Sequence, residues 1–198
     1  MRPTSIIGQR IAIVGSSGSG KSTLGEQIAE LIGAPFVELD ALYWKPGWVG
    51  SEHGEFLGKV EEATAGDAWV VAGNYTRTWP VYWGRADTVV WLDLPLRVCL
   101  ARLVRRSWQR SRERELLWGT NTERFWPQLK LWAPNDSLLA WTVSRRRRLE
   151  REVMRASAAH GLDRRGLARL RSPEDVEAFV RLVAPERTAS RGILAGAR

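Results

Sequence analysis

The feature that constrains this chain most is the segment Gly15–Ser22, whose sequence GSSGSGKS matches the pattern GxxxxGK[ST] in full. A short β-branched run precedes it at 10–14, and apolar residues at helical spacing follow it over 22–32. Glycines let the backbone turn tightly, so that successive N–H groups and a helix N-terminus surround a polyphosphate. In such a loop the lysine reaches the β- and γ-phosphates, and the serine hydroxyl binds Mg²⁺. We therefore predict a site for ATP and magnesium, formed by Gly15, Ser16, Ser17, Gly18, Ser19, Gly20, Lys21, Ser22 and Thr23.

Strand and helix patterns alternate along the chain. Apolar runs predict strands at 10–14, 35–39, 68–72, 88–92 and 166–170. Helical spacing and capping residues predict helices over 22–32, over 51–65, from Pro95 until the pattern fades into the charged segment 105–115, from Asn135 or Asp136 through Ala159, and from Ser172 to Val183. Segments 40–50 and 116–133 are predicted as irregular. This alternation predicts an α/β protein with a parallel sheet between two helical layers, which binds ligands at the carboxyl ends of its strands.

The bulk composition is that of a globular protein with an excess of positive charge. No apolar run approaches the roughly 20 residues that cross a bilayer, the N-terminus has no secretory pattern, and there is one cysteine. We expect a cytoplasmic protein with no membrane partner. The formal charge is +8, from 30 basic and 22 acidic residues. An arginine-rich surface suits a polyanion, and either a nucleotide or a nucleic acid meets that condition.

Three further segments point to a known family. They are Glu38–Trp44 (ELDALYW), Gly73–Tyr75 (GNY) and Trp91–Pro95 (WLDLP). Together with the phosphate loop they resemble the adenylate-kinase-like P-loop proteins labelled DNA topology modulation proteins, across residues 10–180. The resemblance implies a three-layer P-loop NTPase fold with a five-stranded parallel sheet in the order 2-3-1-4-5. It also implies a single domain over 8–184, with an acceptor-side insertion at about 40–66, an Arg-rich lid at about 107–133 and a flexible tail at 185–198.

Two acidic residues follow the second predicted strand. Glu38 and Asp40 lie two residues apart, so their side chains leave an extended strand end on the same side. A carboxylate there can orient or deprotonate an acceptor hydroxyl, or hold a water bound to Mg²⁺. By resemblance to small-molecule kinases both contact the substrate, and Asp40 is catalytic.

A third acidic residue, Asp93, ends the fourth predicted strand. It is the Walker-B-like candidate for a metal ligand beside Ser22, or alternatively the cap of the helix that begins at Pro95. Relatives usually carry Asp before Gly73, where this chain has Ala72. Either Asp40 or Asp93 takes over that role, or catalysis is weak.

The resemblance also assigns residues around the acceptor and in the lid. Tyr43, Asn74 and Arg77 are expected to bind the acceptor. In the lid, Arg102 lies against adenine and Arg106 is the catalytic arginine that touches the transferring phosphoryl group, where a guanidinium stabilises developing charge. Further candidates are Arg105, Arg110, Arg112, Arg114, Arg124 and the run Arg145–Arg148, of which we expect one or two to face the site.

Tryptophan is abundant, with 11 residues. We expect Trp69 and Trp91, within strands, to lie in the core. Others fall in segments expected around the acceptor pocket, namely Trp44, Trp48, Trp79, Trp83, Trp118, Trp126 and Trp132. They form either an aromatic acceptor pocket or a small satellite core under the lid.

Three functions fit these observations. The first is an ATP-dependent phosphotransferase that acts on a small acceptor. The second is a nucleic-acid-associated or regulatory ATP-binding protein, favoured by the charge and by the family label. The third is an ATP-binding scaffold without turnover, suggested by Ala72.

Overall fold

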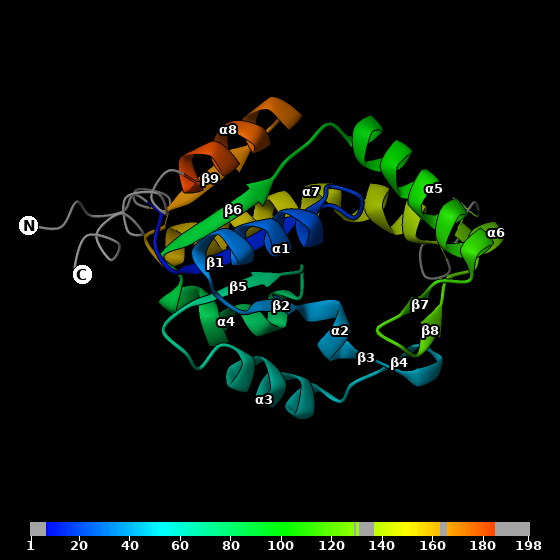
Figure 1. Ribbon diagram of the computed structural model, residues 1–198, viewed down its shortest axis with the longest axis horizontal. Helices are drawn as coiled ribbons and strands as arrows, with labels where there is room; N and C mark the ends of the chain where they lie inside the picture. The colour runs from blue at the N-terminus through cyan, green and yellow to red at the C-terminus, as the bar shows by residue number, and fades with distance from the viewer. Residues whose placement is uncertain (1–6, 129, 131–136, 163–165, 185–198) are drawn as a thin grey trace, which may run out of the picture.

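A five-stranded parallel sheet forms the centre of the computed structural model, which describes residues 7–128, 130, 137–162 and 166–184 (Figure 1). Its strands are β1 (Arg10–Gly15), β2 (Phe36–Glu38), β5 (Trp69–Ala72), β6 (Thr88–Leu92) and β9 (Leu167–Leu170). They are ordered β2-β5-β1-β6-β9, and each neighbouring pair is parallel. In chain order this is 2-3-1-4-5, so the predicted α/β fold and strand order are confirmed.

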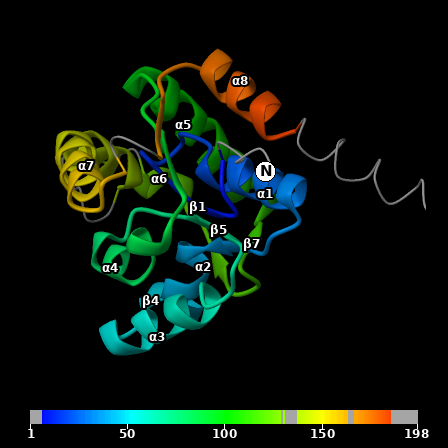
Figure 2. The same ribbon diagram turned by 90° about the vertical axis from the view of Figure 1, so that its left-hand side faces the viewer.

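Both faces of the sheet are covered, because apolar side chains point alternately to either side of each strand. Ala12 and Val14 face a core shared with α3 (His53–Ala63), α4 (Trp79–Tyr82) and α7 (Leu138–Ala159). Ile11 and Ile13 face a second core shared with α1 (Lys21–Ile32) and α8 (Pro173–Val183). Figure 2 shows α7 and α1 on opposite sides of the sheet. The architecture is therefore three-layered.

The helix predicted from Pro95, the third in the sequence pattern, is longer than predicted. Helix α5 runs over Leu96–Glu113, through the charged segment where the pattern was expected to fade. It continues because Cys99, Leu103 and Ser107 are buried at four-residue spacing, which keeps one face of the helix against the protein. Pro95 occupies the N-cap position, not the first turn.

Two segments predicted as irregular contain short elements. The acceptor-side insertion holds α2 (Leu39–Tyr43), β3 (Trp44–Lys45), the 3-10 turn η1 (Pro46–Trp48) and β4 (Val49–Gly50) before α3. The lid after α5 holds β7 (Leu116–Leu117), β8 (Asn121–Thr122) and α6 (Phe125–Gln128). β3 pairs with β4, and β7 with β8, as antiparallel hairpins. Two further 3-10 turns, η2 (Thr76–Thr78) and η3 (Trp83–Arg85), flank α4.

The capping predictions have mixed outcomes. Helix α8 begins as predicted, with a capping box in which the Ser172 hydroxyl accepts from the Asp175 N–H. The cap of α7 is Ser137, whereas the predicted caps, Asn135 and Asp136, lie outside the described residues, as does the predicted tail at 185–198. No helix in the described part of the chain has the length and apolar character needed to span a bilayer.

Candidate functional site

The phosphate loop lies between β1 and α1, at the carboxyl edge of the sheet. Gly18 and Gly20 have φ values of +76° and +95°, a region that other residues rarely adopt. A Cβ atom on Gly18 would lie 2.2 Å from the carbonyl oxygen of Cys99, so packing also requires glycine there. Gly20 is the N-cap of α1 and supplies no side-chain hydrogen bond. The first N–H groups of α1 are therefore left for an anion.

Lys21 lies within the loop that it completes. Its Nζ donates to the carbonyl of Ser16 at 3.2 Å. The pKa of Lys21 is lowered to about 8, mainly by removal from water; the nearby Arg106 also lowers it, while Asp40 and Glu38 act in the opposite direction. These interactions place two cations and two carboxylates around one space. The phosphates of a bound nucleotide would be negatively charged partners for the Lys21 ammonium group.

The affinity for a triphosphate should fall as the pH rises above about 8. A bound polyphosphate favours the ammonium form, so the pKa of Lys21 is higher in the complex than in the free protein. Between these two values the free protein must take up a proton to bind, which lowers affinity by up to about tenfold per pH unit. Below pH 8 the lysine is already charged and affinity is level. Calorimetry with a non-hydrolysable ATP analogue measures this profile, and a flat profile would contradict the assignment. Lys21→Ala should remove the slope.

Glu38, at the end of β2, joins the phosphate loop to the lid. Its Oε1 accepts a hydrogen bond from the Ser22 hydroxyl at 2.6 Å. Its Oε2 accepts from the indole N–H of Trp118, in the lid hairpin, at 2.9 Å. A hydroxyl and a carboxylate are the hard oxygen donors that Mg²⁺ prefers, so Ser22 and Glu38 fit such an ion. No group of three or more His, Cys, Asp or Glu side chains with metal-binding geometry occurs in the described part of the chain. A magnesium ion here would therefore need phosphate or water oxygens as well.

Asp40, in α2, is held by the loop after β5. Its Oδ1 accepts from the Tyr75 hydroxyl at 2.7 Å. Burial and the neighbouring carboxylate raise the pKa of Tyr75 well above its usual range, so the phenol stays neutral and keeps donating. The same loop fixes the start of the phosphate loop, since Asn74 accepts from the Gly15 N–H at 3.1 Å and donates to the Gly15 carbonyl at 2.5 Å. Asn74 therefore holds the first residue of the phosphate loop in place.

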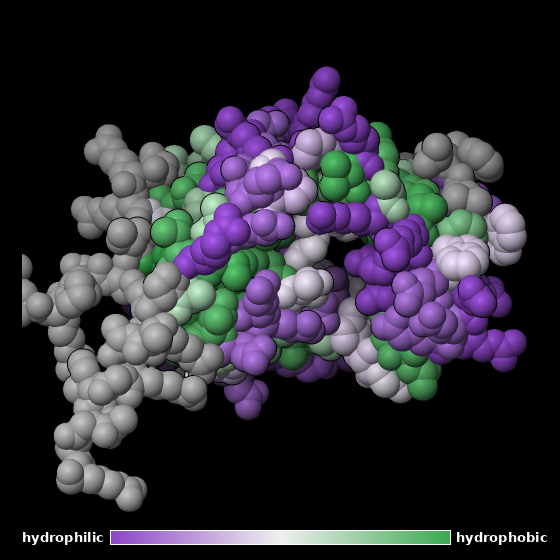
Figure 3. All heavy atoms as spheres, turned by 45° about the horizontal axis from the view of Figure 1, so that its top comes forward, coloured by the Kyte–Doolittle hydropathy of each residue, from purple (hydrophilic) through white to green (hydrophobic). Residues whose placement is uncertain are grey.

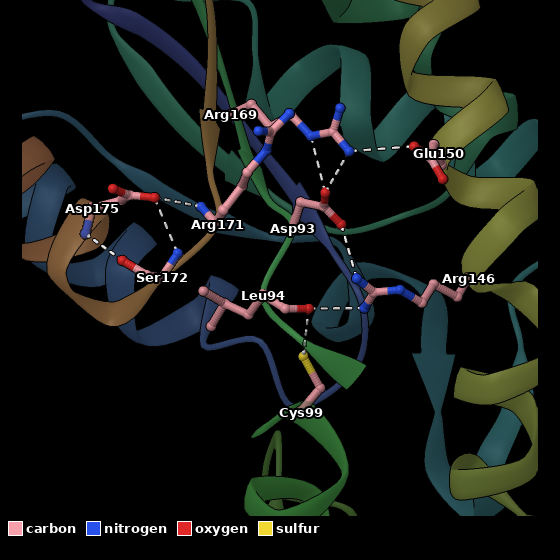
Figure 4. Close-up of polar contacts among 9 residues, drawn as sticks. All are labelled: Asp93, Leu94, Cys99, Arg146, Glu150, Arg169, Arg171, Ser172 and Asp175. Carbon is pink, nitrogen blue, oxygen red and sulfur yellow. Dashed lines mark hydrogen bonds and ion pairs between the residues drawn. The ribbon is translucent and has the colours of Figure 1, made fainter. Parts of the chain in front are cut away.

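Asp93 lies among cations (Figure 4). Arg146 donates to its Oδ1 at 3.1 Å, and Arg169 donates to its Oδ2 at 2.6 Å and 2.9 Å. Arg169 also lies 4.1 Å from the ring centroid of Trp91. Because two positively charged guanidinium groups pair with this carboxylate, the surroundings of Asp93 do not favour the metal role expected for it. The carboxylate anchors α7 and β9 to the end of β6.

Two arginines of α5 reach the phosphate loop. Arg102 donates to the Ser19 carbonyl at 3.5 Å. The side chain of Arg106 is largely buried, and its Nε lacks a hydrogen-bond partner in the described part of the structure. Desolvation and the neighbouring Arg110 lower the pKa of Arg106. Figure 3 shows a hollow between the sheet and the lid, bordered mainly by hydrophilic side chains.

A polar pocket opens on the other side of the phosphate loop, against α7. It is lined by Ser16, Ser17, Asn74, Thr76, Trp141, Thr142, Arg145, Arg146, Arg148, Leu149 and Glu152. Three members of the run Arg145–Arg148 line it, namely Arg145, Arg146 and Arg148. Residues 141, 145, 148 and 152 share a face of α7, and residues 142, 146 and 149 lie along the adjoining face. The guanidinium of Arg145 stacks 3.9 Å from the ring centroid of Trp141.

Other predicted site residues take structural or peripheral positions. The ring of Tyr43 packs on Trp44, Phe56 and Tyr75. Arg77 and Thr23 are exposed and make no hydrogen bond or ion pair with the rest of the described chain through their side chains.

The tryptophans divide between core and site. Trp69 and Trp91 are buried, as predicted. Trp79 and Trp83 are also in the core, stacked at 4.2 Å, so their expected place around the acceptor pocket is wrong. Both lie on the inner side of the α4–η3 segment, which packs on the sheet. Trp132 lies outside the described residues.

Sequence reasoning missed Trp118 and Tyr75 as partners of the two carboxylates. Both were visible, Trp118 in the aromatic set and Tyr75 in the GNY segment. Nothing in the sequence pairs either residue with an acidic residue 80 or 35 positions away.

Comparison with known proteins gives the fold. No protein-family model matches the chain, and no curated protein does. Among solved structures, a shikimate kinase from Acinetobacter baumannii in complex with shikimate matches with a TM-score of 0.54 at 19% identity, covering 94% of this chain and 96% of that one. A gluconokinase from Sinorhizobium meliloti 1021 matches with a TM-score of 0.49 at 18% identity, covering 96% and 99%. The assignment of the fold rests on the match to the shikimate kinase, with which this chain shares a three-layer α/β P-loop fold.

Proposed function

We propose that this protein is an ATP-dependent phosphotransferase that moves the γ-phosphoryl group to a small-molecule acceptor. One observation carries the proposal: Lys21 closes the phosphate loop at the N-terminus of α1, where the neighbouring Ser22 contacts Glu38, and Arg106 and Asp40 lie near enough to shift the pKa of Lys21. Phosphoryl transfer needs little covalent chemistry from a protein, and depends on positioning and on neutralising charge. This constellation supplies both. The kinase-like fold supports the proposal by analogy only.

The phosphate loop and α5 bind the triphosphate in this proposal. Backbone N–H groups at residues 16–22 hold the phosphates, and Lys21 neutralises the β- and γ-phosphoryl oxygens. Arg106 approaches from the opposite side, where its buried guanidinium stabilises charge on the transferring group. Arg102 lies beside the adenine.

Ser22 and Glu38 hold magnesium in this proposal, in place of the expected Ser22 and Asp93. The Ser22 hydroxyl can offer a lone pair to a metal while its O–H still donates to Glu38. In the sheet register Glu38 is paired with Ala72, the position where relatives usually carry Asp. The Glu38 carboxylate, on the neighbouring strand β2, is therefore paired in register with the position where relatives carry an aspartate. When bound, Mg²⁺ would neutralise charge on the phosphates.

The acceptor pocket is the one between the phosphate loop and α7. Asn74 and Thr76 line it, and Tyr75, which lies between them in the chain, donates to Asp40. Arg145 lines the pocket, and no carboxylate in the described part of the chain pairs with it. An unpaired guanidinium favours an acceptor with an anionic group, a carboxylate or a phosphate.

Transfer of labelled γ-phosphate tests the proposal. ATP and Mg²⁺ are incubated with a panel of nucleosides, nucleotides, sugars, sugar phosphates and hydroxy acids, and labelled products are separated from ATP. For an acceptor that is used, Arg145→Ala should raise its KM by roughly tenfold or more, the loss of a charge-assisted hydrogen bond, and leave the KM for ATP unchanged. Arg147→Ala, an exposed neighbour on α7 outside the pocket, is the matched control. Absence of transfer to every acceptor would remove the kinase proposal.

A second candidate, a nucleic-acid-associated ATP-binding protein, is favoured by the outer surface of α7. Arg147, Arg151 and Arg155 are exposed there at four-residue spacing, about 6 Å apart along the axis. Resemblance to DNA topology modulation proteins points the same way. Duplex binding through phosphates weakens steeply with salt, so a duplex titration at low and at physiological salt distinguishes this candidate. No binding at low salt would exclude it.

A further inference from the structure

The lid and the acceptor-side insertion are fastened together. Asn121 of β8 is 2% exposed; its Oδ1 accepts from the Trp48 N–H at 2.9 Å, and its Nδ2 donates to the Lys45 carbonyl at 3.1 Å. The Trp48 indole donates to the Thr122 carbonyl at 3.0 Å. We call this set of bonds between β3–η1–β4 and β7–β8 the hairpin contact. Figure 1 shows the two hairpins side by side.

The hairpin contact places Trp118 over the metal-site carboxylate. Trp118 lies at the turn of the lid hairpin with φ +50°, in the left-handed region, and its ring meets that of Trp48 edge-on at 5.9 Å between centroids. From there its N–H reaches Glu38 Oε2. A non-glycine residue in this conformation persists only where its surroundings hold it. The neighbours of Trp118 therefore fix the direction of its indole.

The indole N–H suits a positioning role. It donates one hydrogen bond and accepts none, so it cannot ligate a cation. It orients the carboxylate and leaves its negative charge in place. Groups that hold a metal-binding carboxylate from behind set the metal affinity, and losing one typically costs about 10- to 100-fold.

We propose that Trp118 is a positioning residue that orients Glu38 for magnesium, so that magnesium binding depends on the lid being docked through the hairpin contact. This inference rests on the proposed function, in which Ser22 and Glu38 hold the ion. It adds that the lid, 80 residues along the chain from Glu38, contributes to the metal site through a single N–H group.

The test measures nucleotide affinity without turnover. A non-hydrolysable ATP analogue is titrated by calorimetry into the full-length protein, once with chelator and once with saturating Mg²⁺, and the gain in affinity is the metal's contribution. Trp118→Phe keeps an aromatic ring against Trp48 but removes the N–H. We expect unchanged affinity in chelator and a magnesium gain smaller by about tenfold. Trp126→Phe is the matched control, since Trp126 is a lid tryptophan that is 77% exposed, and it should keep the wild-type gain.

A double-mutant cycle separates positioning from general lid damage. In a Glu38→Gln background, Trp118→Phe should have no further effect on the magnesium gain, because the carboxylate it orients is gone. An equal effect of Trp118→Phe in both backgrounds, or a wild-type gain in Trp118→Phe, would overturn the proposal. If Trp118→Phe unfolds, Trp118→Leu removes the same N–H and is judged by the same criteria. Failure of the proposed function is a different result: the wild-type protein would then bind no triphosphate or show no magnesium gain.

Discussion

Lys21→Ala should reduce phosphoryl transfer by roughly 10²- to 10³-fold, the effect of removing one preorganised group that stabilises charge in a transition state. Lys21 is the cation inside the loop, with its Nζ at 3.2 Å from the Ser16 carbonyl. Without it, the backbone N–H groups hold the phosphates but the charge that develops on the γ-phosphoryl oxygens is not neutralised. Single-turnover transfer of labelled γ-phosphate measures the rate, and calorimetry measures triphosphate affinity.

A matched control for this substitution is Lys59→Ala. Lys59 is a surface lysine of α3 whose one ion pair among the described residues is with Glu55 at 2.7 Å, so its loss should leave transfer and nucleotide affinity unchanged. A wild-type transfer rate in Lys21→Ala would contradict the assignment of residues 15–23 as the triphosphate site. Weakened binding in Lys21→Ala, together with no transfer by the wild-type protein, would instead identify an ATP-binding scaffold.

Arg106→Ala should lower kcat by about 10³-fold or more, which is the range for arginines that contact a transferring phosphoryl group. The Arg106 side chain is largely buried beside Lys21, and its interactions extend to Asp40 and Glu38. Burial strengthens its field on a neighbouring phosphoryl group, since little water screens it. Arg106→Lys should recover only part of the rate, because an ammonium group lacks the planar fork of guanidinium.

The adjacent Arg105→Ala is the control for Arg106. Arg105 is exposed on the same helix, so its substitution tests whether charge on α5 alone explains the effect. Nucleotide affinity and the unfolding temperature are measured for both variants, because truncating a buried arginine also removes packing. If Arg105→Ala and Arg106→Ala had equal kcat values, Arg106 would not contact the transferring phosphoryl group.

The sequence alone determined the fold and the phosphate loop, because both depend on short-range patterns. Apolar runs define the strands, and the order 2-3-1-4-5 implied by the family resemblance is the one observed. The loop conformation depends on Gly18 and Gly20, which have positive φ values, and the motif requires the glycine at position 20. Ser172 and Pro173 fixed the start of α8 for the same local reason.

The tertiary structure alone decided which acidic residue has which partner. Glu38, Asp40 and Asp93 all follow or adjoin strand ends, and the sequence does not distinguish them as metal ligands. Asp93 is surrounded by guanidinium groups from residues 53 and 76 positions away, while Glu38 meets Ser22 and a lid tryptophan 80 positions away. A carboxylate's role depends on the charges and donors around it, and those arrive from distant segments only when helices and hairpins pack.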